Sequence, residues 1–221
     1  MIHTRSRDAI GALVVADGSL GREVVGLLAE ASLGLKAVTP DDAFEPGDFT
    51  AVALVTDRPY ADLAARLDQR CWEASVPWLE ATMVAHKYRI GPVVVPGRTP
   101  CRDCWLRRIH SQARDPAVLS SLEQRSQASG GSPWFRGELW PLLLEVAALA
   151  AAELMATATG RYAYPARGLG RFLEGDAVFG SPVSRVFARI GRCRRCSQGE
   201  PVESVQRLAD GVRGAAESEA S

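Results

Sequence analysis

Four of the five cysteines in this chain lie in two C-x-x-C pairs, Cys101 with Cys104 and Cys193 with Cys196. Cysteine thiolate is among the best zinc ligands, and four thiolates complete the tetrahedral shell that zinc prefers. A complete shell leaves no open position for water or substrate, so such a site is structural rather than catalytic. The two pairs therefore predict one structural zinc ion bound by four cysteines.

Three other uses of these cysteines compete with zinc. A C-x-x-C pair can be a thioredoxin-like redox motif, but neither pair follows a βαβ pattern in the expected place. Disulfides are disfavoured because no signal peptide precedes the pairs and five cysteines leave one unpaired. An iron–sulfur cluster also takes four cysteines and stays open as an alternative. The fifth cysteine, Cys71, lies in a predicted helix and is interpreted as a small buried hydrophobe.

Both pairs lie among arginines, which are Arg98, Arg102, Arg107, Arg108, Arg192, Arg194 and Arg195. Nearby cations favour the thiolate form of cysteine, although most of these arginines suit a solvated surface equally well. The interval between Cys104 and Cys193 is 88 residues, whereas compact zinc modules close within roughly 15–20. The metal is therefore expected to join two distant parts of one domain.

The elements that must position the cysteines alternate along the first half of the chain. Hydrophobic periodicity predicts strands at residues 10–15, 35–40, 48–59, 76–82 and 88–97, with helices at 22–34 and 60–75. This alternation indicates an α/β domain with a parallel sheet. The second half is predicted as a polar helix at 104–127, a loop at 128–134, an apolar helix at 139–160 and a strand pair within 162–176 and 181–191.

Composition limits the classes of function. The chain has 221 residues and a formal net charge of zero, which argues against a general nucleic-acid binder. Residues 1–197 fit one zinc-stapled α/β domain, and the small polar residues of 198–221 predict a disordered tail. The apolar run at 139–160 contains two glutamates, so a buried helix is expected rather than a membrane span. Without an export signal, the cytoplasm is the expected location.

A glycine loop at residues 16–21, A-D-G-S-L-G, lies between the first predicted strand and helix. Glycine loops before a helix can bind phosphate on the helix N-terminus, and the dinucleotide fingerprint is G-x-G-x-x-G. Here Ala16 replaces the first glycine and Asp17 adds a negative charge where a phosphate would approach. Gly18 and Gly21 therefore either remain from a nucleotide site or serve turn geometry and close packing of the helix.

Asp57 is the second candidate of this region, because it ends a predicted strand where open α/β sheets bind their ligands. A carboxylate in that position could hold magnesium. It could equally cap the helix that follows, and Pro59 at the start of that helix suits the second role. We favour the cap.

The order of these features resembles the ThiF/MoeB/E1 superfamily of ubiquitin-activating-like enzymes, which adenylate a carboxylate and carry zinc on two C-x-x-C pairs. The stretch "PGRTPCRDCWLRR" at 96–108 looks still more like the E1-like partners of YcaO cyclodehydratases. These enzymes form azoline and thiazole or oxazole rings in ribosomally made peptides (RiPPs). The resemblance covers about residues 10–197 and implies a truncated Rossmann-like E1 fold. It also implies zinc ligation by all four paired cysteines, an ATP loop at residues 16–21 and a magnesium-binding role for Asp57.

Departures from the pattern imply that adenylation is lost. Arg58 replaces the asparagine of the active enzymes' "TDN" segment, and neither their Arg–Gln segment nor a crossover cysteine has a counterpart. Gly18, Gly21 and Asp57 would then form a vestigial nucleotide site, with zinc as the cofactor and no use of ATP. We expect a non-catalytic partner subunit of a cyclodehydratase complex. The alternatives are an ATP-dependent ThiF-type adenylating or sulfur-transfer enzyme and, more weakly, a nicotinamide-dependent oxidoreductase.

The expected partners are a YcaO-type cyclodehydratase and a separate leader-peptide-binding protein or the precursor peptide itself. Many E1-like partners begin with a winged-helix module that binds the leader peptide, and the first predicted strand starts too early in this chain to leave room for one. A homodimer or hetero-complex is expected, without nucleic acid or membrane. Trp134 and Phe135 are the interface candidates, whereas Trp140 is assigned to the core.

Overall fold

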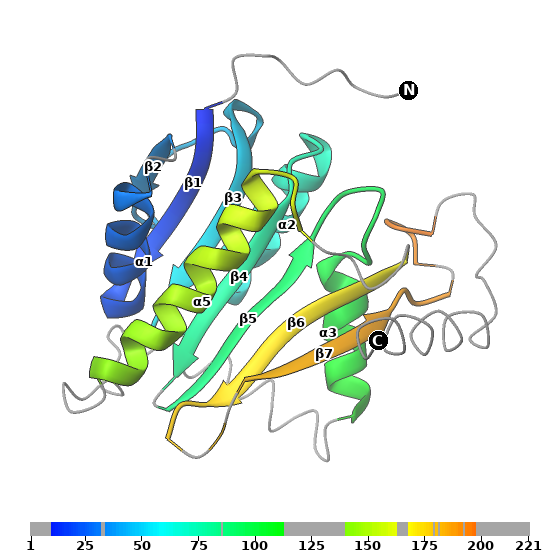
Figure 1. Ribbon diagram of the computed structural model, residues 1–221. Coiled ribbons are helices and arrows are strands. Elements are labelled where there is room, and N and C mark those ends of the chain that lie inside the picture. The colour runs from blue at the N-terminus through cyan, green and yellow to red at the C-terminus, as the bar shows by residue number, and fades with distance from the viewer. Residues whose placement is uncertain are drawn as a thin grey trace, which may run out of the picture.

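The computed structural model describes residues 10–31, 34–84, 86–112, 140–162, 168–178, 180, 182–191 and 193–197. In this part of the chain one seven-stranded sheet lies between two layers of helices (Figure 1). The predicted loop at 128–134, the predicted tail at 198–221 and the interface candidates Trp134 and Phe135 lie outside the described residues.

The sheet has the strand order β2-β1-β3-β4-β5-β6-β7. Its strands are β1 (Ile10–Asp17), β2 (Leu35–Val38), β3 (Phe49–Thr56), β4 (Trp78–Val84), β5 (Lys87–Val94), β6 (Leu169–Asp176) and β7 (Val183–Ala188). The first four strands pair in parallel, and β5, β6 and β7 each pair antiparallel with the preceding strand. The predicted parallel sheet is therefore wrong for its second half. Only residues 85 and 86 separate β4 from β5, and so short a connection joins antiparallel strands, whereas a parallel pair needs a long crossover.

In the part of the chain that the structure describes, four helices cover the two faces of the sheet. They are α1 (Gly18–Glu30), α2 (Ala61–Glu73), α3 (Arg102–Gln112) and α5 (Trp140–Ala158). One face carries α1 and α5, and the other carries α2 and α3 (Figure 1). A single 3-10 turn, η1 (Pro46–Asp48), precedes β3. The first helix starts four residues earlier than the periodicity predicts, because the glycine loop itself forms its first turn.

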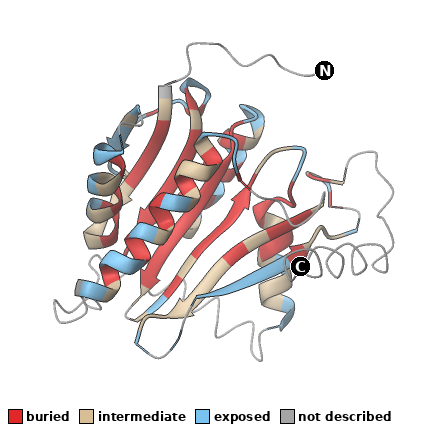
Figure 2. Cartoon of the chain, viewed as in Figure 1, coloured by how far each residue is buried: buried red, intermediate tan, exposed pale blue. Residues whose placement is uncertain are grey.

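The apolar helix α5 packs on the sheet, as its sequence predicts. Its buried apolar residues follow helical spacing and face α1 and the sheet; they are Leu143, Val146, Ala147, Ala150, Ala151 and Leu154. The opposite side of the helix is exposed (Figure 2). Among the described helices, Pro141–Ala158 is long and apolar enough to cross a membrane by length and composition alone. The buried stripe identifies it here as the core helix of one sheet face.

The other face of the sheet has its own core under α2. Leu63, Leu67 and Cys71 of that helix pack against Val52 and Trp78 of the sheet. Cys71 is fully buried, so its interpretation as a small hydrophobe is confirmed. Burial also raises the pKa of its thiol to about 12, which keeps it protonated and chemically inert at neutral pH.

Candidate metal centre and glycine loop

The first cysteine pair is positioned by a tight turn between β5 and α3. The Thr99 hydroxyl accepts a hydrogen bond from the Val95 N–H at 2.7 Å, and the Thr99 N–H donates to the Val95 carbonyl at 3.0 Å. Gly97 supplies the positive φ of 76° within this turn. The chain then enters α3, which places Cys101 just before the helix and Cys104 in its first turn.

The second pair follows β7 in a turn closed at both ends. The Cys193 N–H donates to the Ile190 carbonyl at 3.2 Å, and the Ser197 N–H donates to the Cys193 carbonyl at 3.0 Å. The Ser197 hydroxyl adds two bonds, accepting from the Cys193 N–H at 3.1 Å and donating to the Ile190 carbonyl at 3.0 Å. Cys193 and Cys196 are therefore fixed on one side of a compact loop.

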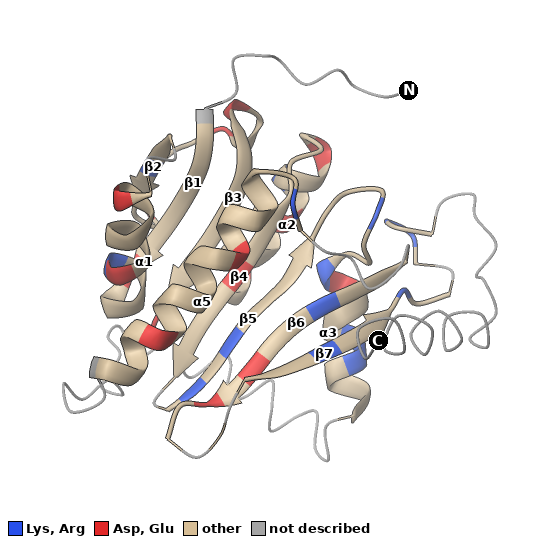
Figure 3. Ribbon diagram, in the orientation of Figure 1, with Lys and Arg blue, Asp and Glu red and all other residues tan. Residues whose placement is uncertain are grey.

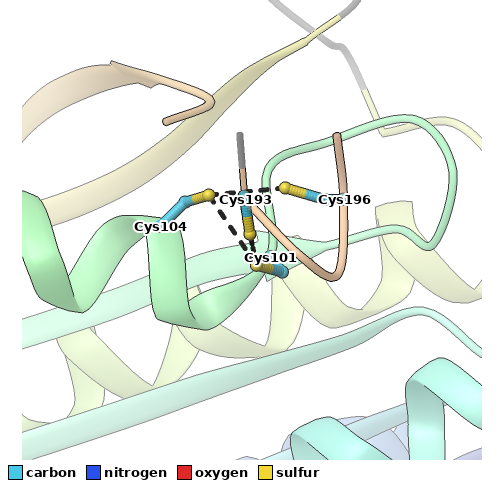
Figure 4. Close-up of side chains that lie close together, drawn as sticks. All are labelled: Cys101, Cys104, Cys193 and Cys196. Atoms are coloured by element: carbon cyan, nitrogen blue, oxygen red, sulfur yellow. Dashed lines mark hydrogen bonds between the residues drawn. The ribbon is translucent and has the colours of Figure 1, made fainter. Parts of the chain in front are cut away.

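The four sulfurs converge (Figure 4). The Sγ–Sγ distances are 3.8 Å between Cys101 and Cys104, 3.6 Å between Cys101 and Cys193, and 3.3 Å between Cys104 and Cys196. All four sulfurs lie within 4.8 Å of one another, and all four residues are buried. A tetrahedron with Zn–S bonds of about 2.3 Å has S–S edges of about 3.8 Å. A disulfide needs sulfurs only about 2.05 Å apart, so this is a cluster of free cysteines that could hold a metal ion.

Further contacts join the two pairs. The Arg108 guanidinium on α3 donates to the carbonyls of Ala188 and Arg189 at 2.7 and 3.3 Å, at the end of β7. The Ile190 N–H donates to the Cys104 sulfur at 3.4 Å. A hydrogen bond donated to sulfur favours the thiolate, which is the form that binds metal.

The crowded sulfurs shift one another's pKa values in opposite directions. Hydrogen bonds from Cys101 and Cys104 to the Cys196 sulfur lower the pKa of Cys196 to about 4. The pKa of Cys104 is raised because its thiol shares protons with Cys101 and Cys196 and is buried. A bound divalent cation would replace these shared protons, since metal binding to cysteines releases them.

A buried acidic residue that the sequence analysis missed anchors the first pair. Glu80 on β4 is 1% exposed and accepts ion pairs from Arg102 and Arg89, each with an N–O distance of 3.4 Å. The Arg89 guanidinium also lies over the ring of Trp105, 4.5 Å from its centroid. The signal for this site was a lone glutamate inside the apolar strand "VPWLEAT".

The second pair has a matching anchor at Asp68 on α2. This buried carboxylate accepts a hydrogen bond from Trp78 Nε1 at 3.0 Å and pairs with Arg195. Burial raises the pKa of Asp68, and the charge of Arg195 works against that rise. Arginines on either side of the cysteines are thus held by specific carboxylates.

The glycine loop and the cysteines lie at opposite ends of the strands of the sheet. Both cysteine pairs follow the ends of β5 and β7, which run in the same direction, antiparallel to β4. The glycine loop and Asp57 follow the ends of β1 and β3, which are parallel to β4. The sulfur cluster therefore cannot take part in chemistry at the glycine loop.

Asp57 occupies the N-terminus of α1. Its carboxylate accepts hydrogen bonds from the Ser19 N–H at 2.6 Å and the Leu20 N–H at 2.8 Å. The expectation that Asp57 caps the helix that follows it is wrong, because α2 begins after Tyr60 and has no side-chain cap. Burial raises the pKa of Asp57, and its two backbone hydrogen bonds lower it in part. The backbone groups that would bind a phosphate are thus bonded to a carboxylate of the same chain.

The loop glycines have separate steric roles. Gly18 has a φ of +79°, and a Cβ there would lie 2.3 Å from an Asp57 carboxylate oxygen. At Gly21 a Cβ would lie 3.0 Å from the Cβ of Ala16 and from the Val55 carbonyl, so α1 approaches the sheet closely there. Gly18 provides the turn beside Asp57, and Gly21 provides the close packing.

The rim of this loop is closed by a small polar network. The Tyr60 hydroxyl donates to Asp17 at 2.7 Å, and Arg58 Nε lies 3.4 Å from the same carboxylate. Arg58 also donates to the Tyr60 hydroxyl. Arg58, the residue that departs from the E1 "TDN" segment, is therefore engaged with Asp17 beside the loop.

No protein-family model matches the sequence, and neither does any curated protein. Solved structures do match. A heterocyclase in complex with substrate and cofactor is 22% identical with a TM-score of 0.57, over 86% of this chain and 26% of its own. The E. coli microcin synthetase McbBCD complex is 13% identical with a TM-score of 0.62, over 86% of this chain and 70% of the matched one. E. coli MccB with ATP is 15% identical with a TM-score of 0.58, over 85% and 66%.

These identities are too low to carry an activity across, and this chain spans only about a quarter of the heterocyclase's length. What the likenesses share is the arrangement of the α/β fold. The resemblance drawn from the cysteine motifs and the strand–helix order is thereby confirmed at the level of the fold. This chain has an α/β fold similar to those of a heterocyclase and of a chain of the McbBCD microcin synthetase, with a four-cysteine cluster that could hold a metal.

Proposed function

We propose that this protein is a non-catalytic partner subunit of a YcaO-type cyclodehydratase complex that modifies a ribosomal precursor peptide. The observation that carries the proposal is the Asp57 carboxylate, hydrogen-bonded to the amides of Ser19 and Leu20. These amides are the groups with which a helix N-terminus binds phosphate. In an E1-like fold whose phosphate site is occupied by its own carboxylate, the surface can still bind a partner. Adenylation would be lost, because the nucleotide could not bind.

The electrostatics of the loop support the same function. A nucleotide would have to displace Asp57 from α1 and approach Asp17, which lies at the start of the same helix. Each carboxylate would repel the incoming phosphates, and Arg58 is already paired with Asp17. A displaced Asp57 would also leave a buried carboxylate without its hydrogen bonds, which costs free energy unless new partners replace them.

Zinc is the cofactor that we propose for the cysteine cluster. Cys101, Cys104, Cys193 and Cys196 would hold it, and the sulfur spacing of 3.3–3.8 Å fits a tetrahedral shell. When bound, the ion supplies structural cross-linking rather than chemistry. It would hold the end of β7 against α3, on the sheet edge away from the glycine loop.

The proposed partners are inferred from proteins of similar fold and not from a contact in this structure. One structural neighbour is itself a multi-subunit assembly, the microcin synthetase McbBCD complex, and another is a heterocyclase holding substrate and cofactor. We therefore propose a cyclodehydratase as the enzyme partner and a precursor peptide, or a separate leader-binding protein, as the further component. ATP would be consumed by the enzyme partner.

An ATP-dependent adenylating enzyme is the second candidate, and one observation favours it. The structural neighbour MccB was crystallised with ATP, so the fold itself is compatible with nucleotide. The two functions differ in one reaction that this chain would perform alone, the adenylation of a carboxylate with release of pyrophosphate.

Two assays test the proposal. The first measures ATP–pyrophosphate exchange by the purified zinc-loaded chain, alone and with the precursor peptide. The second measures ring formation in the precursor peptide by the cyclodehydratase, with and without the chain. The proposed function predicts no exchange above a protein-free control, together with ring formation that depends on adding the chain. Exchange that requires the chain would move the adenylating enzyme to first place. Ring formation at full rate without the chain would remove the partner role.

A further inference from the structure

A cavity of about 620 Å³ lies between α2, α3 and the second cysteine pair. Charged side chains line most of it, and they are Asp68, Arg102, Asp103, Arg107, Arg194 and Arg195. Basic segments are visible on α3 and on the coil that carries the second cysteine pair (Figure 3). The lining thus contains four guanidinium groups and two carboxylates, and this excess of positive charge makes the cavity an attractive site for an anion.

Three of these guanidiniums are held in place by carboxylates, one of them behind the cavity wall and two within the wall itself. Arg102 is anchored on the buried Glu80 at 3.4 Å, and Arg195 on the buried Asp68. Arg107 pairs with Asp103 one helical turn away at 3.0 Å. Anchored arginines lose little further side-chain freedom when a ligand binds, and their planar fork suits carboxylates.

The cysteine cluster assembles the cavity. Arg102 and Arg107 belong to α3, which begins at the first cysteine pair, whereas Arg194 and Arg195 are the two residues inside the second C-x-x-C. The convergence of the four sulfurs therefore brings the two arginines of α3 close to the two arginines of the second C-x-x-C pair. No cysteine lines this cavity, so its arginines face a space open to a ligand.

The size and charge of the cavity favour a peptide over other anions. A volume of about 620 Å³ falls within the range of about 300–1,000 Å³ typical of ligand pockets, and it suits a few residues of an extended chain. A nucleic acid would need a wide basic surface, whereas this chain has no net charge and two aspartates in the cavity wall. Carboxylate side chains spaced along a peptide can meet the arginines and avoid the aspartates.

We propose that this arginine cavity binds an acidic segment of the precursor peptide and that the zinc ion, by joining the two cysteine pairs, is required for that binding. The inference rests on the proposed function, since it names the contact through which this subunit would hold the peptide. It assigns the arginines between the cysteines a role in recognition in addition to any effect on the thiolates.

The test is fluorescence anisotropy of a labelled six-residue peptide of alternating Glu and Gly, titrated with the full zinc-loaded chain at low salt. A matched peptide with Gln in place of Glu is the ligand control. We expect the Glu peptide to bind at least tenfold more tightly than the Gln peptide. Arg107→Glu and Arg194→Glu should each weaken binding at least tenfold, and chelation of the metal should abolish it.

Arg185→Glu is the matched control variant, because Arg185 is an exposed arginine on β7, paired with Glu174 and outside the cavity. It should change peptide affinity by less than twofold, and every variant compared must keep its zinc and its unfolding midpoint. Equal binding of the Glu and Gln peptides, equal loss in Arg185→Glu, or tighter binding of inorganic phosphate than of the peptide overturns the inference. The proposed function fails by a different result, which is no association of the wild-type chain with its cyclodehydratase.

Discussion

At the scale of single atoms, the proposed loss of nucleotide binding rests on the Asp57 carboxylate. It bonds the two amides at the start of α1 and stands 2.3 Å from where a Cβ of residue 18 would be. The loop is therefore filled as well as altered in sequence. The proposed loss of nucleotide binding can therefore be tested by removing this one side chain.

Replacing Asp57 with alanine should create an anion site. The change frees two helix amides and removes a negative charge, so pyrophosphate should bind the variant at least tenfold more tightly than the wild type. The wild type should bind ATP or pyrophosphate with a Kd weaker than about 1 mM, which corresponds to about 4 kcal/mol of binding free energy. Isothermal titration calorimetry measures both, and micromolar ATP affinity of the wild type would show that the site still works.

Gly18→Ala should destabilise the fold, because alanine would take up a φ of +79° and contact the Asp57 carboxylate. We expect a loss of about 1–3 kcal/mol in the free energy of unfolding. Gly26→Ala is the control in the same helix, where a Cβ meets no atom within 4 Å. That change should stabilise the protein by up to about 1 kcal/mol, since alanine favours helix. Urea unfolding of both variants checks the contrast, and equal effects would contradict it.

At the scale of elements, the cysteine cluster connects α3 to the segment after β7. Its sulfurs lie close enough for a tetrahedral metal, and the two turns are held in place by a hydrogen bond that Thr99 accepts and by bonds that Arg108 and Ser197 donate. The antiparallel second half of the sheet makes this connection possible, because β5 and β7 run in the same direction and therefore end on the same side of the sheet.

Purified protein should contain one zinc per chain, and Cys193→Ser should lose it. Binding free energies of about 10–16 kcal/mol in small zinc peptides also stabilise their folds, and a larger domain depends on the metal for a smaller share of its stability. We therefore expect a lower unfolding midpoint and lower solubility for Cys193→Ser or after chelation. Cys71→Ala, at a buried cysteine outside the cluster, should keep its zinc. Elemental analysis that finds iron or no metal contradicts the assignment.

Glu80→Gln should weaken the contact between β4 and α3. Glu80 is 1% exposed, and its loss as a charge leaves Arg102 and Arg89 without their carboxylate. Breaking a buried ion pair costs several kcal/mol, reduced here because Arg89 is partly exposed, so we expect a loss of about 2–4 kcal/mol. Glu174→Gln, in an exposed pair with Arg185, should change stability by less than about 1 kcal/mol. Similar values for the two variants would rule out a special role for Glu80.

Sequence patterns predicted much of the fold and the two cysteine pairs of the cluster for particular physical reasons. Helical spacing in α5 and the alternation of strands and helices report burial directly, and a C-x-x-C pair is a local motif. The direction of β5 and the partner of Asp57 depend on which segments become neighbours in space. Ser19 and Leu20 are 38 and 37 residues from Asp57 in the chain, so periodicity carries no information about that bond. Sequence patterns did not predict the ion pairs of Glu80 and Asp68 for the same reason.

At the scale of the whole molecule, the fold places the four-cysteine cluster and the glycine loop at opposite ends of the strands of one sheet. This separation leaves the surface around the cysteines available for a partner or a peptide. The chain is expected to self-associate or to join a complex with its pathway enzyme. Light scattering tests this association. The variant Trp134→Ala, at a position outside the described residues, should associate more weakly than the wild type and keep the same zinc content. A monomer under all conditions would contradict it.

The central claim is that the chain is required for peptide modification but does not use its own nucleotide loop. Mass spectrometry of the precursor peptide measures it most directly, as water lost per ring formed with the cyclodehydratase and ATP. Asp57→Asn keeps a side chain of the same shape but removes the carboxylate that any magnesium would need. We predict that ring formation requires the chain and proceeds equally with wild type and Asp57→Asn. Ring formation that is independent of the chain, or abolished by Asp57→Asn in folded zinc-loaded protein, would contradict the account.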